Sequence, residues 1–189
     1  MTTVYFIRHA ESDYRNHDDA LRPLSEKGMI DRLLVTSFLD DKNIDVVLSS
    51  PYVRAIDTVK DFADKHNMKI KTVDAFRERK VDSIWIENFD QFAEKQWKDF
   101  NYRFFDGECL KEVQDRNISA LQEALKQYKE KSIIIGSHGT ALSTIINYYD
   151  SSFGFRDFND MKKRMPWIVK FSFDNQVSIK IEKIDLFVE

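Results

Sequence analysis

Short apolar runs alternate with longer amphipathic stretches along most of this chain. The runs at residues 3–9, 44–50, 68–76 and 132–140 are rich in β-branched and aromatic residues, as buried strands are. The stretches at residues 22–41, 52–66, 109–131 and 141–150 repeat apolar residues at helical spacing. Strands that alternate with helices predict a largely parallel sheet covered by helices on both faces.

Two further segments add a hairpin and an insertion to this predicted fold. Residues 167–173 and 177–184 alternate apolar and polar side chains around a short turn, which predicts a terminal antiparallel hairpin. Residues 87–103 mix aromatic and polar side chains and predict a helix inside a cap-like insertion at about 80–107. We therefore expect one domain over residues 1–189: a three-layer α/β/α sandwich with a mostly parallel mixed sheet and a C-terminal antiparallel hairpin.

The charge balance and the cysteine count narrow the class of protein. The chain has 29 Lys and Arg against 32 Asp and Glu, so nothing favours nucleic acid or a membrane surface as a partner. It has no apolar run of about 20 residues. Cys109, the single cysteine, excludes an intramolecular disulfide and fits a reducing compartment, so we expect a cytoplasmic protein. The edge strand of the hairpin could pair between chains or be blunted by its lysines, which leaves the oligomeric state open.

Chemically active side chains gather where the predicted strands end. In an open α/β sheet, ligands bind beyond the carboxyl ends of the strands. Two histidines, arginines from more than one strand end, a carboxylate and a helix N-terminus that opens at Gly139 can therefore meet in one cleft. The residues at these strand ends are Arg8 and His9, Ser49, Ser50 and Arg54, Arg77 and Glu78, and Ser137 and His138.

This collection of side chains favours phosphoryl transfer through a phosphohistidine. Arginine forks and helix N-terminal amides match phosphate oxygens. Surrounding cations would keep a histidine neutral, and a neutral histidine is a nucleophile. A nearby carboxylic acid could protonate the leaving group and then take a proton from water. Two flanking arginines would repel a divalent cation, and neither His9 nor His138 stands in an H-x-x-E-H or H-x-D motif, so we expect neither a metal nor a cofactor.

The motifs at these positions resemble those of the histidine phosphatase superfamily, the phosphoglycerate-mutase-like fold. The stretch FIRHAES resembles the family's R-H-G-[E/Q]-[S/T] signature, and RPLSEKG resembles its D-x-P-L-[S/T]-x-x-G segment. LSSPYVRAIDT, FRE and GSHGT resemble three further family segments. All five follow the family's order and spacing, which makes the resemblance far more specific than any one motif.

The resemblance implies a role for each matching residue. It makes His9 the phosphate-accepting nucleophile and Glu78 the general acid and base, while Arg8, Arg54 and His138 hold the phosphoryl group.

The chain departs from the family pattern at three positions. Ala10 replaces a glycine, Cys109 replaces a serine beside the retained Glu108, and Arg15 stands where mutases have asparagine. We expect Arg15 and Glu108 as possible substrate contacts.

Less specific interpretations remain open for single residues. Glu78 lies in the charged run RERK, which is typical of a solvated surface. Arg54 could pair with Asp57 on the surface of its helix.

Four functions are compatible with the pattern. The first is a phosphatase acting on a small-molecule phosphate ester or a phosphoprotein. The short chain, without the mutases' paired arginines, makes a phosphoglycerate mutase the second choice. A catalytically silent module that binds phosphorylated ligands is the third, although it would need no nucleophile. A metal hydrolase built on His9 and His138 is the fourth.

Overall fold

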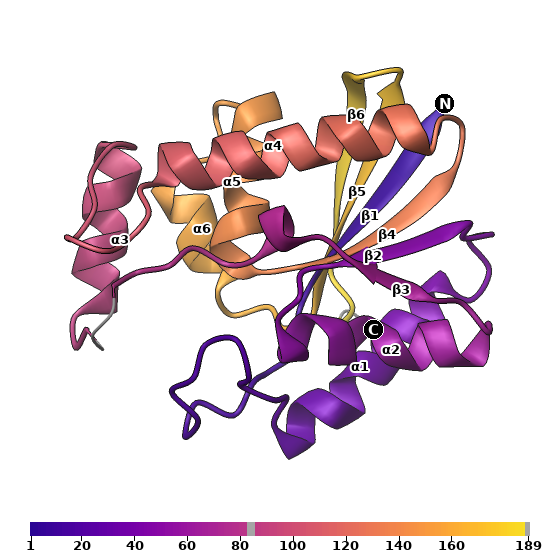
Figure 1. The fold of residues 1–189 in the computed structure, drawn as a ribbon, viewed down its shortest axis with the longest axis horizontal. Helices are drawn as coiled ribbons and strands as arrows, with labels where there is room; N and C mark the ends of the chain where they lie inside the picture. Colours follow the sequence, from indigo (N-terminus) through magenta and orange to yellow (C-terminus); the bar gives the residue numbers. More distant parts are fainter. Residues whose placement is uncertain (83–85, 188–189) are drawn as a thin grey trace.

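The computed structural model describes residues 1–82 and 86–187, which form a six-stranded sheet in the order β3-β2-β4-β1-β5-β6 (Figure 1). Neighbouring strands among β1 to β4 are parallel, whereas β5 runs antiparallel to both β1 and β6. The predicted mixed sheet with a terminal antiparallel hairpin is confirmed. The strands are β1 (Thr2–Arg8), β2 (Val46–Ser49), β3 (Ile70–Thr72), β4 (Ser132–Ser137), β5 (Trp167–Asp174) and β6 (Val177–Ile184).

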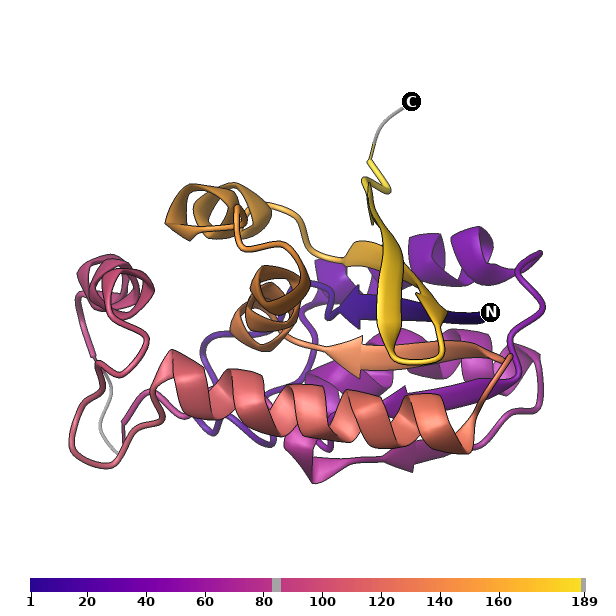
Figure 2. The same cartoon turned by 90° about the horizontal axis from the view of Figure 1, so that it is seen from above.

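Helices cover both faces of the sheet (Figure 2). Side chains of α1 (Glu26–Leu39) and α2 (Val53–Lys65) pack against one face of the sheet. There they form one buried cluster with the strand residues Tyr5, Ile7 and Ile134. Side chains of α4 (Leu110–Gln127), α5 (Gly139–Tyr149) and α6 (Phe155–Met161) pack against the other. This is the expected three-layer arrangement. No helix in the described ranges has the length and apolar character needed to cross a lipid bilayer.

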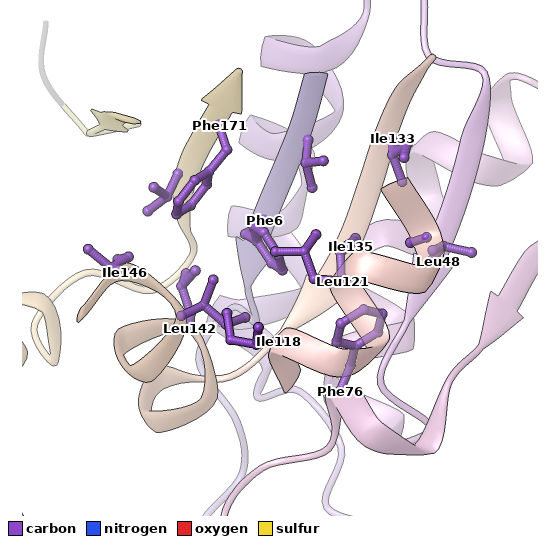
Figure 3. Packing of buried hydrophobic residues seen from close by; sticks show 14 of the residues in the cluster. Phe6, Leu48, Phe76, Ile118, Leu121, Ile133, Ile135, Leu142, Ile146 and Phe171 are labelled. Atoms are coloured by element: carbon purple, nitrogen blue, oxygen red, sulfur yellow. The ribbon is translucent and has the colours of Figure 1, made fainter. Parts of the chain in front are cut away.

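The larger core cluster lies between the sheet and the α4–α5 layer (Figure 3). Phe6 and Ile135 face Leu121 of α4 and Leu142 of α5, and all four side chains are buried. Ile134 points to the opposite face, as the two-residue period of a strand requires. Burial on both faces explains why these strands read as continuous apolar runs.

The structure corrects the expected elements in several places. The strand expected at 68–76 is confined to Ile70–Thr72 and is followed by a short 3-10 helix, Asp74–Phe76. Helix α6 was not predicted, because its seven residues are too few to show a period. In α1, Ile30 and Leu33 are 67% and 49% exposed, although both match the helical spacing.

The segment at 80–107 contains α3 (Phe89–Lys98), a shorter helix than the one expected at 87–103. Both views place α3 at one end of the molecule, beyond the sheet (Figures 1 and 2). Residues 83–85 of the predicted insertion lie outside the described residues.

Candidate active site

The register of the sheet brings the two candidate histidines together. Arg8, the last residue of β1, pairs with Ser137, the last residue of β4. His9 and His138 leave the sheet directly after this pair, and their ring centroids lie 5.3 Å apart. Adjacent parallel strands that end at the same level therefore place both imidazoles at one edge of the sheet.

A cavity of about 910 Å³ opens at this edge. It is lined by six of the residues expected there: Arg8, His9, Arg54, Glu78, Gly139 and Thr140. His138 lies beside it, fully buried, with its Nε2 2.7 Å from the Ser50 hydroxyl. The predicted convergence of strand ends thus holds for most of the set. The alternative, in which Arg54 pairs with Asp57 on the surface of its helix, is wrong, because Arg54 is buried and pairs with Asp19.

Hydrogen bonds define which ring nitrogen of His9 carries the proton. Nδ1 lies 2.7 Å from the carbonyl oxygen of Ala10, which can only accept, so Nδ1 carries the proton. Nε2 then holds a lone pair and accepts from Nε of Arg54 at 3.2 Å. Burial, reinforced by the charges of Arg54 and Arg8, holds the pKa of His9 well below its usual value of 6.5. The ring is neutral near pH 7, with its free nitrogen beside an arginine.

His138 is held neutral by the same influences. Burial lowers its pKa well below 6.5, and the charge of Arg54 acts in the same direction. Its Nδ1 has no hydrogen-bond partner among the described residues. The hydroxyl of Ser50 holds Nε2 of the ring and so fixes the imidazole beside the cavity.

Arg8 lies beneath the start of α5 and reaches α6. A Cβ added to Gly139 would approach Nε of Arg8 to 3.3 Å, so a glycine allows the guanidinium to lie directly under the helix start. One terminal nitrogen donates to the carbonyls of Met161 and Arg164, at 2.6 and 2.8 Å. Burial lowers the pKa of Arg8 to about 10, so it stays charged at neutral pH.

Arg54, 2% exposed, is paired with a residue of the loop that follows β1. Its NH2 group donates to Oδ1 of Asp19 at 3.0 Å, and its NH1 group donates to the Asp19 carbonyl. Arg22 donates to the same carboxylate at 3.3 Å. One carboxylate therefore pairs with both arginines at the wall of the cavity and offsets part of their positive charge.

Glu78 binds the N-terminus of α5. Its carboxylate accepts from the amides of Thr140 and Ala141, both at 3.0 Å, and from the amide of Arg79 at 2.8 Å. The sequence predicted that the helix amides would face a phosphate, but two of them hold this carboxylate instead. The helix N-terminus favours a negative charge, so it fixes Glu78 at the cavity rather than leaving it in a solvated run.

Arg15 and Glu108 do not line the cavity, so neither is retained as a substrate contact. The Arg15 side chain is 91% exposed and pairs with Asp13. Glu108 turns away from the cavity because Arg116 and the Lys80 amide bind its two oxygens.

Ala10 replaces the family's glycine without strain. It is not among the described residues with a positive φ, so a side chain is allowed there.

Sequence reasoning missed several charged residues that line the cavity, among them Asp19, Arg22, Arg79 and Lys162. Arg79 is 2% exposed, although the run RERK reads as solvated. Its guanidinium lies 5.3 and 5.2 Å from the ring centroids of Phe89 and Phe92 and donates to Gln96. The helical spacing of these three α3 residues was visible in the sequence, but nothing local showed what their common face covers.

Across the described residues, no three His, Cys, Asp or Glu side chains gather as ligands for a metal ion. The groups that converge are instead cations and neutral imidazoles around a carboxylate. This set suits an anion such as a phosphoryl group.

Comparison with known families identifies the class of protein to which this fold and this cavity belong. The model of the histidine phosphatase superfamily (branch 1) matches residues 4–176, and the chain belongs to this family. Phosphoserine phosphatase 1 of Hydrogenobacter thermophilus is 27% identical over 153 residues, which cover 73% of this chain and 71% of the relative. The uncharacterized phosphatase PhoE of Bacillus subtilis is 25% identical over 150 residues, which cover 77% and 76%.

Solved structures share the fold. The phosphoserine phosphatase of Entamoeba histolytica, solved with 3-phosphoglyceric acid, superimposes with a TM-score of 0.79. The two chains are 19% identical, and the match covers 100% of each. The shared architecture thus extends over the whole chain, including the segment that contains α3.

Proposed function

We propose that this protein is a metal-independent phosphatase that hydrolyses a small phosphate monoester through a phosphohistidine on His9. The observation that carries the proposal is the state of the His9 ring. Its unprotonated Nε2 faces Arg54 in a cavity that Arg8 and Glu78 also line. A neutral imidazole nitrogen beside two guanidinium groups is a nucleophile placed where an anionic phosphoryl group would bind.

In the first step, Nε2 of His9 attacks phosphorus. For this step Glu78 carries a proton on Oε2, which accepts one amide where Oε1 accepts two. The N–P bond forms as the ester P–O bond breaks, and that proton passes to the leaving oxygen. Arg8 and Arg54 stabilise the charge on the other phosphoryl oxygens, together with His138. The products of this step are a free alcohol, phosphohistidine and a Glu78 carboxylate.

In the second step, water attacks the phosphohistidine. Glu78 takes one proton from the water, the water oxygen bonds to phosphorus, and the N–P bond breaks. Inorganic phosphate leaves, His9 is again neutral and Glu78 is again protonated. Each cycle consumes one ester and one water.

The size of the cavity favours a small substrate over a phosphoprotein. A volume of about 910 Å³ lies within the range of sites that enclose small molecules. The curated relative in Hydrogenobacter thermophilus is named for phosphoserine, which is such a molecule.

The test is phosphate release from phosphoserine, 3-phosphoglycerate and p-nitrophenyl phosphate with a chelator present. We expect turnover by the unchanged protein and a loss of at least about 100-fold in His9→Ala. His66→Ala is the matched control, because His66 lies outside the cavity at the end of α2. Isomerised phosphoglycerate in place of free phosphate would establish a mutase instead. Full activity in His9→Ala, or activity that requires added metal, would overturn the mechanism.

A further inference from the structure

The segment that carries Glu78 has no regular structure of its own. It follows the short 3-10 helix Asp74–Phe76 and is described as coil through residue 82. A coil cannot hold a general acid in place through its own backbone ladder, so its backbone groups must bind elsewhere. Their partners identify what positions the carboxylate.

Arg116 of α4 binds this segment from behind. Its NH1 group donates to the carbonyls of Ala75 and Arg77, at 2.7 and 2.8 Å, and its NH2 group donates to the carbonyl of Glu78 at 3.1 Å. The remaining two N–H groups donate to Glu108, at 2.8 and 3.0 Å. Every N–H of this guanidinium is therefore used, and three of them bind the backbone around the carboxylate.

Glu108 completes the arrangement on the other side of Glu78. Its Oε2 accepts from the backbone amide of Lys80 at 2.9 Å, and its Oε1 accepts from Arg77 at 3.1 Å. Its own amide donates to the carbonyl of Lys80 at 2.8 Å. Backbone groups on both sides of Glu78 are thus bound either by Arg116 of α4 or by Glu108, which lies just before α4.

From these contacts we infer that Arg116 and Glu108 are positioning residues, which set the Glu78 carboxylate over the N-terminus of α5. Both are largely shielded, with side chains 15% and 17% exposed. A shielded ion pair holds the arginine more rigidly than an exposed pair would. The arginine therefore fixes the carbonyls that it binds, because its planar guanidinium loses little conformational freedom for each hydrogen bond that it makes. Neither residue lines the cavity, so neither touches the substrate.

This inference rests on the proposed role of Glu78 and predicts a dependence on the leaving group. An alkyl phosphate releases an alkoxide that needs a proton, whereas p-nitrophenyl phosphate releases an anion that is stable without one. Glu78→Gln should therefore lower kcat/KM on an alkyl ester at least about 100-fold and change kcat/KM on the aryl ester much less. The ratio kcat/KM is compared because it reports phosphoryl transfer to His9, whereas kcat also includes the attack of water, which Glu78 assists for both esters. Arg116→Met should show the same selectivity, with a loss of about 10- to 100-fold on the alkyl ester.

The experiment compares kcat and KM on phosphoserine and p-nitrophenyl phosphate, with concentrations corrected for the folded fraction. Vanadate affinity should stay within about twofold, because Arg116 does not touch the phosphoryl site. Adding Arg116→Met to Glu78→Gln should cause no further loss, since one residue acts through the other. Arg103→Met is the matched control, because Arg103 is 51% exposed and pairs with Glu112 at the start of the same helix.

If Arg116→Met does not fold, Glu108→Gln tests the same inference. Both oxygens of Glu108 accept hydrogen bonds, so an amide would set a donor against Arg116, Arg77 or the Lys80 amide. The same loss confined to the alkyl ester is expected. Equal losses on both esters, or none, would overturn the positioning role. A Glu78→Gln variant without leaving-group selectivity would instead refute the proposed role of Glu78 itself.

Discussion

Asp19 places a carboxylate on the arginine that is proposed to bind the phosphoryl group. Its side chain and carbonyl accept from Arg54, and Arg22 binds the same carboxylate. An incoming phosphate must compete with this carboxylate for the Arg54 guanidinium. Without a ligand, the Arg54 guanidinium is therefore already paired with a carboxylate. Binding of phosphate would exchange the Asp19 carboxylate for a phosphate anion.

Replacing Asp19 by Asn should tighten the binding of inorganic phosphate as a competitive inhibitor. The variant removes the competing charge and keeps the size of the side chain. A partly exposed ion pair is worth up to about 1 kcal/mol, so the inhibition constant should fall by up to about fivefold. Asp13→Asn is the control, because Asp13 pairs with Arg15 outside the cavity. Weaker phosphate binding in Asp19→Asn would show that the carboxylate assists the anion rather than competing with it.

The pKa of His9 should depend on Arg54. Burial is the largest cause of its low value, and the charge of Arg54 is the next. Arg54→Gln removes that charge and should raise the pKa of His9 towards 6.5, as measured by NMR titration of the imidazole in the free protein. Arg32→Gln is the control, because Arg32 donates to the Asp57 carbonyl away from the cavity. An unchanged or lower pKa in Arg54→Gln would contradict this electrostatic account.

At the scale of elements, α3 is joined to the segment that carries Glu78 through the buried side-chain amide of Gln96. Gln96 accepts from Arg79 and donates to the carbonyls of Tyr102 and Glu108, at 2.9 and 3.0 Å. Its side chain links the α3 helix, the loop that follows it and the residue next to Glu78. Few other polar contacts of α3 reach the sheet-bearing part of the described chain.

Gln96→Leu should therefore destabilise the protein and loosen α3. It leaves a buried guanidinium and two carbonyls without their partner, at a cost of about 2–4 kcal/mol. Denaturant unfolding measures the loss, and hydrogen exchange should accelerate within Phe89–Lys98. Gln91→Leu, at an exposed position of the same helix, should change neither. Equal stability of the two variants would show that Gln96 is dispensable.

For the whole molecule, the two buried histidines link stability to pH. Their pKa values are lowered by folding, so below pH 6.5 the unfolded chain binds protons that the folded chain does not. The free energy of unfolding then falls as pH falls, by up to about 2.7 kcal/mol per pH unit for two groups. The loss continues from pH 6.5 down to the folded pKa values.

Urea unfolding at pH values between 7.5 and 5.5 measures this dependence. His9→Gln removes one of the two groups and should reduce the slope by about half. A slope that His9→Gln leaves unchanged would show that His9 is readily protonated in the folded protein.

Sequence reasoning succeeded where the signal is local. The continuous apolar runs of β1 and β4 and the period of 3.6 in α2 and α4 predicted the layers, and the rule on strand ends then brought His9 and His138 together. It failed where a contact depends on packing between distant segments. Nothing near Asp19 indicates Arg54, and nothing near Arg116 indicates three carbonyls around Glu78. Helix α6, which ends where Arg8 donates to carbonyls, was missed for its shortness.

The position of β1 has a consequence for how the chain acquires its shape during synthesis. The first strand pairs with Ser132–Ser137 and with Trp167–Asp174, so the centre of the sheet joins the two ends of the chain. Contacts so far apart in sequence close slowly. On the ribosome, β1 must wait until residues 132–174 have emerged, and until then its apolar side chains lack their native neighbours. The cavity at the end of β1 therefore forms only after these later strands have been made.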